Sequence, residues 1–224
     1  MPKQHLKRLA APKTWLIKRK GITFSVRPRP GAHSFAMGMP LSIILRDVMG
    51  IAKTEKEVKH ILQKNDIKVD GKRRKDHRFI IGLMDSIQIE KKDLMMVLNQ
   101  RGKLVLIENK TPGQKLCRIT GKHLVKGKIQ LGFHDGNTLF TENKDIKVGD
   151  TLLVSIPDRE IKEHLQLKEK AQVYLVGGSH IGDVGTIEDI TGNLIVCKTK
   201  ETTYMTQKRY AFIVGGEKPL LVMP

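Results

Sequence analysis

The chain has 224 residues, and 41 lysines and arginines against 23 aspartates and glutamates give it a formal net charge of +18 at pH 7. A chain this basic attracts polyanions, which means nucleic acid or an anionic membrane surface. The sequence argues against the membrane, because it has no long basic amphipathic helix, no signal sequence and no apolar run near the roughly 18 residues that span a bilayer. We therefore expect an intracellular, cytoplasmic protein with a nucleic-acid partner.

The two cysteines, Cys117 and Cys197, stand alone in strand-like runs. Neither belongs to a CxxC pair, and none of the eight histidines stands at ligand spacing to another. We expect both thiols to pack as small apolar side chains, with no disulfide framework, no metal and no cofactor. Aromatic residues make up only 4% of the chain, so each globular part should have a small aliphatic core.

Residues 1–40 form a basic N-terminal extension. No acidic residue occurs before Asp47, and the segment 28–40 is rich in proline and glycine. Such a segment cannot bury enough apolar surface to fold alone, so we expect it to be disordered in isolation and to order against a phosphate backbone. Trp15, the only tryptophan, can stack on a base or fill a protein groove, and both remain open. The candidate RNA-binding residues of the extension, with one just beyond it, are Lys7, Arg8, Lys13, Trp15, Lys18, Arg19, Lys20, Arg27, Arg29 and Arg46.

Two short helices are predicted after the extension. Apolar residues from Leu41 to Val48 fall at i, i+3, i+4 and i+7, which lines one face of a helix, and Gly50 can end it in the left-handed conformation. Thr54 and Glu57 have the spacing of a capping box, in which each side chain accepts from the other residue's backbone N–H. A second helix should begin there, with an apolar side facing the first helix and lysines on the other side.

A β-hairpin should follow the second helix. Ile67 and Val69 alternate as in a strand, the dipeptide Asp70-Gly71 suits a tight turn, and a cationic run precedes a second apolar strand at 79–81. A solvated surface explains any single lysine here, but for the whole set beside a hairpin we predict an RNA surface. Its candidate residues are Lys53, Thr54, Lys56, Lys59, Lys64, Lys72, Arg73, Arg74, Lys75 and Arg78. The order helix, glycine, capped helix, IKVDGK, basic run and GLMDSIQI resembles the small RNA-binding domain named after bacterial ribosomal protein S four.

Short apolar or alternating runs separated by turn signals make up residues 91–170, and their spacing predicts a small β-barrel or sandwich. Gly121 is taken as one of the turns. The segment 158–170 fits a short helix or an edge strand, and we predict a strand. The other predicted strands cover residues 94–98, 104–107, 117–120, 129–131, 138–140 and 151–156.

Residues 171–224 contain a glycine-rich loop between strand-like runs, with two further strands predicted at 194–197 and 210–214. The run QVYLVGGSHIGDVGTIEDI resembles the KOW motif of SH3-like barrels that touch ribosomal RNA or elongating polymerase. Acidic Asp183 stands where basic or amide side chains often flank the loop, so backbone contact, protein contact and a purely structural hairpin remain open beside phosphate contact. The candidate loop residues are Gly177, Gly178, Ser179, His180, Gly182 and Gly185.

Taken together, these parts resemble the archaeal and eukaryotic family of ribosomal small-subunit protein four. The stretches KTWLIKRKG, PRPGAHSF, PLSIILRDV, DIKVDGKRRKDHRFIIGLMD and VGGSHIGDVGTIEDI carry the resemblance, and the end at Pro224, without the longer eukaryotic tail, favours the archaeal version. The resemblance implies an α+β multidomain fold with four parts. These are a basic arm (1–40), a helix-helix-hairpin RNA-binding domain (41–90), a central small β-barrel or sandwich (91–170) and a KOW-type SH3-like β-barrel (171–224).

The same resemblance implies a structural constituent of the small ribosomal subunit that binds ribosomal RNA, neighbours other ribosomal proteins and supports assembly and translation. It implies no catalysis and no small-molecule substrate. Two other functions remain open. An RNA-modifying enzyme, such as a pseudouridine synthase, would need a catalytic carboxylate in a pocket, for which His134-Asp135 and Glu163-His164 are weak candidates. A KOW-bearing transcription factor would purify with polymerase.

Overall fold

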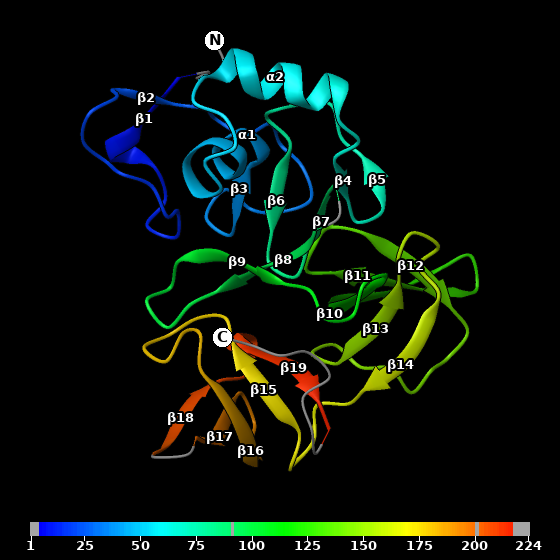
Figure 1. Cartoon of the computed structure of the whole chain (residues 1–224). Helices are drawn as coiled ribbons and strands as arrows, with labels where there is room; N and C mark the ends of the chain where they lie inside the picture. The colour runs from blue at the N-terminus through cyan, green and yellow to red at the C-terminus, as the bar shows by residue number, and fades with distance from the viewer. Residues whose placement is uncertain (1–4, 91, 200–201, 217–224) are drawn as a thin grey trace. The chain divides into compact units, whose positions relative to one another are not determined.

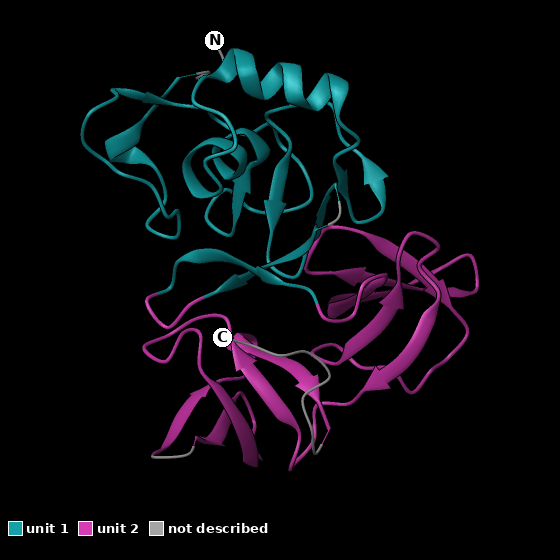
Figure 2. Cartoon of the chain, in the orientation of Figure 1, with its two compact units in different colours: residues 1–98, 102–109 teal, residues 99–101, 110–224 magenta. Residues whose placement is uncertain are grey.

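The computed structural model describes residues 5–90, 92–199 and 202–216 (Figure 1). In these ranges the chain is mostly β, with few helices. It divides into two compact units, residues 1–98 with 102–109 (unit 1) and residues 99–101 with 110–224 (unit 2) (Figure 2). Within the described ranges, no helix combines the length and the apolar character needed to cross a membrane.

Among its described residues, unit 1 contains the α-helices α1 and α2, a π-helical turn η2, a 3-10 turn η1 and three sheets, of two, two and five strands. The sheets pair β1 with β2, pair β3 with β6, and run in the order β5-β4-β7-β8-β9. The elements are β1 (Leu6–Lys7), η1 (Arg8–Ala10), β2 (Phe24–Ser25), β3 (Gly38–Pro40), α1 (Leu41–Ile43), η2 (Ile44–Val48), α2 (Glu55–Lys64), β4 (Lys68–Val69), β5 (Lys72–Arg73), β6 (Ile80–Gly82), β7 (Ser86–Ile89), β8 (Lys92–Leu98) and β9 (Leu104–Glu108).

The first predicted helix is confirmed, although α1 passes into a π-helical turn, η2. Leu41, Ile44 and Leu45 are fully buried, as their spacing predicts. Gly50 follows with a φ of +67°, a conformation that costs glycine little. The local pattern of the sequence therefore determines both this helix and its end.

The helix α2 begins at the predicted cap. The Thr54 hydroxyl accepts from the Glu57 N–H at 3.3 Å, and the Glu57 carboxylate accepts from the Lys53 N–H at 2.8 Å and also interacts with the Thr54 N–H. The cap is thus the predicted capping box, extended to the residue before Thr54. Val58 and Leu62 are buried beneath the helix.

The hairpin turn at Asp70-Gly71 is confirmed, with φ of +49° and +71°. The prediction that residues 79–81 form the second strand of this hairpin is wrong. The second strand is β5, which lies within the cationic run and pairs with β4. The apolar strand β6 pairs instead with β3. Burial explains the difference: Ile80 and Ile81 are 3% and 0% exposed and need an apolar neighbour, whereas both residues of β5 are exposed.

The expectation of a disordered extension is wrong for residues 5–40. Trp15 is 1% exposed, its indole N–H donates to the Gly38 carbonyl at 2.7 Å, and its ring meets that of Phe35 edge-on with centroids 5.5 Å apart. The extension has no core of its own, but its tryptophan is buried in unit 1 and bonds to β3. A base therefore cannot stack on Trp15. The geometry supports the other alternative, in which this ring fills a groove of the protein itself.

Replacing Trp15→Phe should lower the free energy of unfolding by about 1–3 kcal/mol, because it leaves the buried Gly38 carbonyl without its donor. Urea denaturation of the whole chain, followed by circular dichroism, measures the change. As a control, Phe24→Leu alters an aromatic ring that is 53% exposed, and such surface changes usually stay within ~0.5 kcal/mol. Equal stability of the Trp15 and Phe24 variants would contradict the burial of this contact.

Unit 2 contains two five-stranded antiparallel sheets, in the orders β12-β11-β10-β13-β14 and β18-β17-β16-β15-β19. A buried apolar cluster that includes Ile119, Leu131 and Leu152 forms the core of the first sheet. The elements are β10 (Gln114–Val125), β11 (Lys128–Phe133), β12 (Thr138–Thr141), β13 (Thr151–Ser155), β14 (Ile161–Leu165), β15 (Gln172–Leu175), β16 (Val184–Thr191), β17 (Leu194–Lys198), β18 (Thr203–Gln207), η3 (Lys208–Tyr210) and β19 (Ala211–Gly215).

The predicted strands after residue 90 are all present, and the segment 158–170 contains a strand, β14, as predicted. The turn placed at Gly121 is wrong. Strand β10 continues through this glycine with a register shift, and the chain turns at Lys126-Gly127, where φ is +48° and +79°. Strand β18 was not predicted, because its alternating polar residues carry little apolar signal.

Both cysteines are buried and neither forms a disulfide, as expected. Cys117 belongs to the core of the first sheet of unit 2, and Cys197 lies in β17 of the second. Burial raises the pKa of the Cys197 thiol to about 11, so it stays protonated at neutral pH. Each cysteine therefore acts as a small apolar side chain.

Candidate nucleic-acid interface

Unit 1 has an open groove of about 550 Å³ where the strand pair β1–β2 meets the start of α2 and the segment before β6. We call it the cationic groove. Five of its lining residues are arginines or lysines, and they come from four separate stretches of the chain. The lining residues are His5, Ile22, Phe24, Ser25, Val26, Arg27, Arg29, Arg46, Glu55, Lys59, His77 and Arg78.

Backbone contacts hold the extension against the segment that follows the hairpin. The Arg78 guanidinium donates to the Arg27 carbonyl at 2.9 Å, and the Arg29 N–H donates to the Arg78 carbonyl at 3.0 Å. The Arg29 side chain also lies 3.2 Å from the Asp76 carboxylate in an exposed ion pair. Cations that are 51 residues apart in the sequence therefore share one groove.

The groove is cationic at neutral pH. Its one carboxylate among the described lining residues, Glu55, pairs with Lys59 at 2.7 Å, and the Lys59 ammonium lowers the pKa of Glu55. His77 lies 3.2 Å from the same carboxylate, but burial lowers the pKa of its imidazole, so it is neutral at pH 7. Among the described lining residues, five positive charges face one negative charge, and Arg29 and Arg46 also pair with Asp76 and Asp47 beside the groove. The remaining excess of positive charge favours an anion such as a phosphate.

An apolar rim accompanies these charges. Ile22 and Phe24 are 60% and 53% exposed, and the ring of His5 lies 5.8 Å from that of Phe24. An exposed ring beside arginines can contact a base or a sugar. The sequence reasoning missed Ile22, Phe24, His5 and His77. The apolar residues that lead into the arginines in ITFSVRPRP were a signal for Ile22 and Phe24, but no sequence signal pointed to the two histidines.

The lysine side of α2 is exposed as predicted, and the Asp70-Gly71 hairpin adds further charges. Arg73 already has partners within the protein: its guanidinium donates to the Gln63 carbonyl at 3.1 Å and lies 3.3 Å from the Asp66 carboxylate. The guanidinium of Arg74 lies 4.2 Å above the ring of Phe79. The exposed residues of this predicted set outside the groove are Lys53, Thr54, Lys56, Lys64, Lys72, Arg73 and Lys75.

Some predicted residues of the extension hold the extension itself in place. Arg8 is 3% exposed and pairs with Asp47 at 2.5 Å, so its placement among the RNA-binding residues is wrong for the same reason as that of Trp15. The Arg19 guanidinium donates to the carbonyls of Ala11 and Pro12 at 2.7 and 2.8 Å. Within residues 5–40, the part of the extension that the structure describes, the exposed lysines are Lys7, Lys13, Lys18 and Lys20, and they do not line the groove.

In unit 2 the glycine-rich loop is closely packed. A Cβ on Gly177 would lie 2.4 Å from the Tyr210 ring, and one on Gly182 would lie 2.5 Å from the backbone of Asn99. The His180 ring stacks on that of Tyr204, with centroids 3.8 Å apart. These contacts explain Gly177 and Gly182 by close packing, and Gly178 and Gly182 also have the positive φ values, +87° and +88°, that favour glycine. RNA contact by the exposed Gly178 and Ser179, and by the half-buried His180, stays a prediction.

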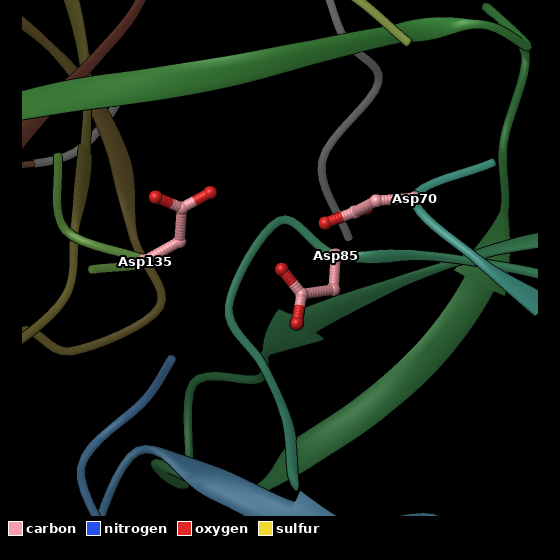
Figure 3. A group of neighbouring side chains, drawn as sticks. All are labelled: Asp70, Asp85 and Asp135. Carbon is pink, nitrogen blue, oxygen red and sulfur yellow. The ribbon is translucent and has the colours of Figure 1, made fainter. Parts of the chain in front are cut away.

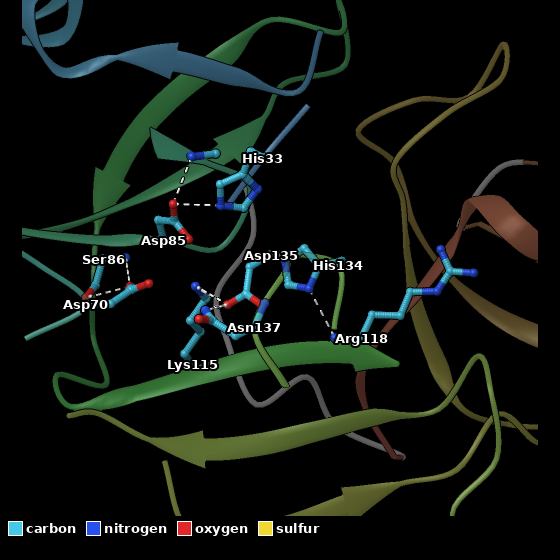
Figure 4. Close-up of polar contacts among 10 residues, drawn as sticks. His33, Asp70, Asp85, Ser86, Lys115, Arg118, His134, Asp135 and Asn137 are labelled. Carbon is cyan, nitrogen blue, oxygen red and sulfur yellow. Dashed lines mark hydrogen bonds and ion pairs between the residues drawn. The ribbon is translucent and has the colours of Figure 1, made fainter. Parts of the chain in front are cut away.

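The three carboxylates drawn in Figure 3 each have partners within their own unit. Asp70 accepts from the Ser86 N–H at 3.0 Å, and Asp85 lies 2.8 Å from the imidazole of His33 (Figure 4). Asp135 belongs to the other unit, where the Lys115 ammonium lies 2.9 Å away. Each carboxylate is thus explained by a local structural contact, and none supports a metal site.

The suggested catalytic pair His134-Asp135 is structural as well. The His134 ring accepts from the Arg118 N–H at 3.2 Å and meets the Phe212 ring edge-on, while Asp135 is bound to Lys115 (Figure 4). His164 lies 2.8 Å from Asp150 rather than beside a reactive opening.

Comparison with known proteins decides the family. Two family models match, Ribosomal family S4e over residues 90–161 and the RS4NT (NUC023) domain over residues 1–36. Small ribosomal subunit protein eS4 of Methanosphaera stadtmanae is 38% identical, covering 98% of this chain and 95% of that protein. The eS4 of Methanocaldococcus jannaschii is 36% identical, covering 98% and 97%. The chain belongs to the ribosomal S4e family.

A solved structure agrees with this S4e membership. The crystal structure of the 30S ribosomal protein S4e from Thermoplasma acidophilum matches 80% of this chain and 96% of that one, with a TM-score of 0.71 and 35% identity. The predicted resemblance to an archaeal-type small-subunit family is confirmed. The prediction that the chain is not an enzyme is confirmed too, because S4e proteins are named as ribosomal proteins.

Proposed function

We propose that this chain is a structural constituent of the small ribosomal subunit, and that it binds ribosomal RNA through the cationic groove and the exposed lysines of α2. The relatives named small ribosomal subunit protein eS4 support the assignment to the small subunit. The observation that carries the RNA partner is the meeting of Arg27, Arg29, Arg46, Lys59 and Arg78 in one groove. Neighbouring ribosomal proteins are the other partners that we infer from the family.

The mechanism is neutralisation of phosphate charge. Each arginine or lysine seated on a phosphate releases condensed counterions, so the logarithm of the binding constant should fall with the logarithm of salt concentration by roughly 0.7 to 0.9 per contact. Folded RNA is recognised mainly by shape and backbone, and exposed rings add contacts to unpaired bases. A groove lined by five cations and the exposed ring of Phe24 fits both demands.

We infer further that the chain works as four successive parts, a basic arm, an S-four-type RNA-binding domain, a central β domain and a KOW-type barrel. The separate sheets β10–β14 and β15–β19 support the last two. Since β8 and β9 continue the sheet of β4, β5 and β7, the second part is better ended near residue 109 than at residue 90. The KOW assignment of residues 171–224, of which 200–201 and 217–224 lie outside the described residues, rests on the sequence motif.

Two measurements test the function. The purified chain should bind small-subunit ribosomal RNA transcribed in vitro, with a binding constant that falls steeply between 50 and 200 mM potassium chloride, as roughly 6 to 10 phosphate contacts would require. In a cell extract separated on a sucrose gradient, the chain should sediment with the small subunit. Sedimentation with RNA polymerase, or as a free protein, would defeat the proposal.

A further inference from the structure

In unit 2 the strands β10 and β11, labelled in Figure 1, stay paired as far as Val125 and Lys128, beyond the last core residue of β11, Ile129. Ile129, at the end of that core, is 9% exposed, whereas its partner across the strands, Leu124, is 75% exposed. Val125 is 37% exposed, and Phe140 on the adjacent strand β12 is 55% exposed. Side chains alternate between the faces of a sheet, so Leu124 and Phe140 leave both faces of this end apolar and in solvent.

An open cleft of about 790 Å³ lies on the Leu124 side of this hairpin. We call it the hairpin cleft. Its lining includes four lysines, Lys122, Lys126, Lys128 and Lys144, and one carboxylate, Glu142. The cleft therefore combines an apolar floor with a cationic rim.

The lysines have different tasks. The Lys122 ammonium donates to the carbonyls of Lys144 and Ile146 at 2.8 and 2.7 Å, which fixes the segment that follows β12. Lys126 lies in the turn, with a left-handed φ of +48°, and Lys128 follows it at the start of β11. Both are exposed, and both line the cleft.

We propose that the hairpin cleft is a second RNA-contact surface, in which Lys126 and Lys128 hold the phosphodiester backbone and Leu124 meets a base or sugar. Two observations favour RNA over a protein occupant. The rim has an excess of positive charge, and lysine is depleted at protein–protein interfaces, where arginine and aromatic residues are enriched instead. The inference rests on the proposed function and adds a site in the other unit of the chain.

The test uses the whole chain and small-subunit ribosomal RNA transcribed in vitro. Loss of two phosphate contacts in Lys126→Gln/Lys128→Gln should flatten the salt slope by roughly 1.4 to 1.8 and weaken binding roughly 25- to 60-fold at 0.1 M salt. Leu124→Ser should weaken binding without changing the slope. All three residues are exposed, and circular dichroism should confirm that the variants fold.

A matched control removes two exposed lysines of the same unit that lie outside the cleft, in Lys162→Gln/Lys168→Gln. The proposal is overturned if the hairpin and control variants bind RNA with the same constant and slope while the wild-type chain binds normally. In that outcome the proposed function stands and the hairpin is left to a protein partner. If the wild-type chain itself shows no salt-dependent binding, the proposed function fails and the hairpin site fails with it.

Discussion

Reversing three charges of the cationic groove, in Arg27→Glu/Arg29→Glu/Lys59→Glu, should weaken binding of small-subunit ribosomal RNA by more than roughly 100-fold at 0.1 M salt. Three lost phosphate contacts account for a slope change of roughly 2.1 to 2.7, and the introduced carboxylates add repulsion. The constant and its salt dependence can be measured by filter binding with labelled RNA. This is the largest effect on RNA binding that the structure leads us to expect from three exposed side chains.

The fold should survive these changes. Arg29 and Lys59 are 66% and 50% exposed at their side chains, and their ion pairs with Asp76 and Glu55 are surface pairs worth about 0–1 kcal/mol. The Arg27 backbone carbonyl, which accepts from Arg78, is unaffected by the change of side chain. An unchanged circular dichroism spectrum and urea midpoint would show that lost affinity reflects lost contacts.

Net charge alone also affects RNA affinity, so the control must change it equally. The variant Lys162→Glu/Lys168→Glu/Lys170→Glu reverses three exposed lysines of unit 2 that lie outside the groove. It should lose much less affinity than the groove variant. Equal losses would mean that the chain binds RNA by overall charge, and the groove would have no special role.

The sequence predicted those features that depend on residues close together in the chain. The helix over Leu41–Val48, its end at Gly50, the cap at Thr54 and the turn at Asp70-Gly71 all follow from patterns of eight residues or fewer. These patterns work because helix periodicity, capping and turn conformation are local properties. The exposure of the α2 lysines could also be predicted, because the apolar side of the helix must be buried and the lysines lie on the opposite side.

The groove could not be predicted in this way. The groove forms because Arg78 makes hydrogen bonds with the Arg27–Arg29 segment. Arg27 and Arg78 are 51 residues apart in the sequence, so no local pattern reveals this contact. Charge counting placed Arg8 with the RNA-binding residues, but Arg8 is buried and forms an ion pair with the partly buried Asp47. A charged residue's role depends on which groups surround it in the fold, and composition does not contain that information. The turn at Lys126-Gly127 was missed because Gly121 offered a more familiar signal, which here marks an irregularity inside a strand.

The largest expected effect on stability concerns the buried ion pair of unit 2. Lys115 and Asp135 are 4% and 3% exposed at their side chains, and the Lys115 ammonium lies 2.9 Å from the carboxylate. Replacing Lys115→Met leaves the carboxylate buried without its counter-charge, which typically costs about 3–5 kcal/mol. Urea denaturation at pH 7, followed by circular dichroism, should show this loss, and a loss below about 1 kcal/mol would mean that the pair contributes no more than a surface one.

The pH dependence identifies the carboxylate as the cause. Burial by itself raises the pKa of Asp135, but the Lys115 charge and the hydrogen bonds from Lys115 and Asn137 outweigh it and lower that pKa from 3.8 to about 2. In the wild-type chain this group therefore contributes about 2 kcal/mol of stability above pH 4, and the contribution is lost as the pH falls toward 2. In Lys115→Met the effects of burial, Asn137 and His134 remain, but the Lys115 charge is gone. Protonation of Asp135 should then remove the uncompensated buried charge, so the difference in stability from wild type should shrink on acidification.

A double variant separates the buried charge from the lost packing of the lysine. In Lys115→Met/Asp135→Asn no charge is buried, and the amide can still bond to Asn137, whose side chain donates to Asp135 at 2.8 Å. Most of the stability lost in Lys115→Met should return, because replacing both members of a buried pair is far less costly than removing one. If the double variant were as unstable as Lys115→Met, the lost stability would come from packing around Lys115 rather than from the unpaired carboxylate. The difference in stability between Lys115→Met and wild type would then not depend on pH.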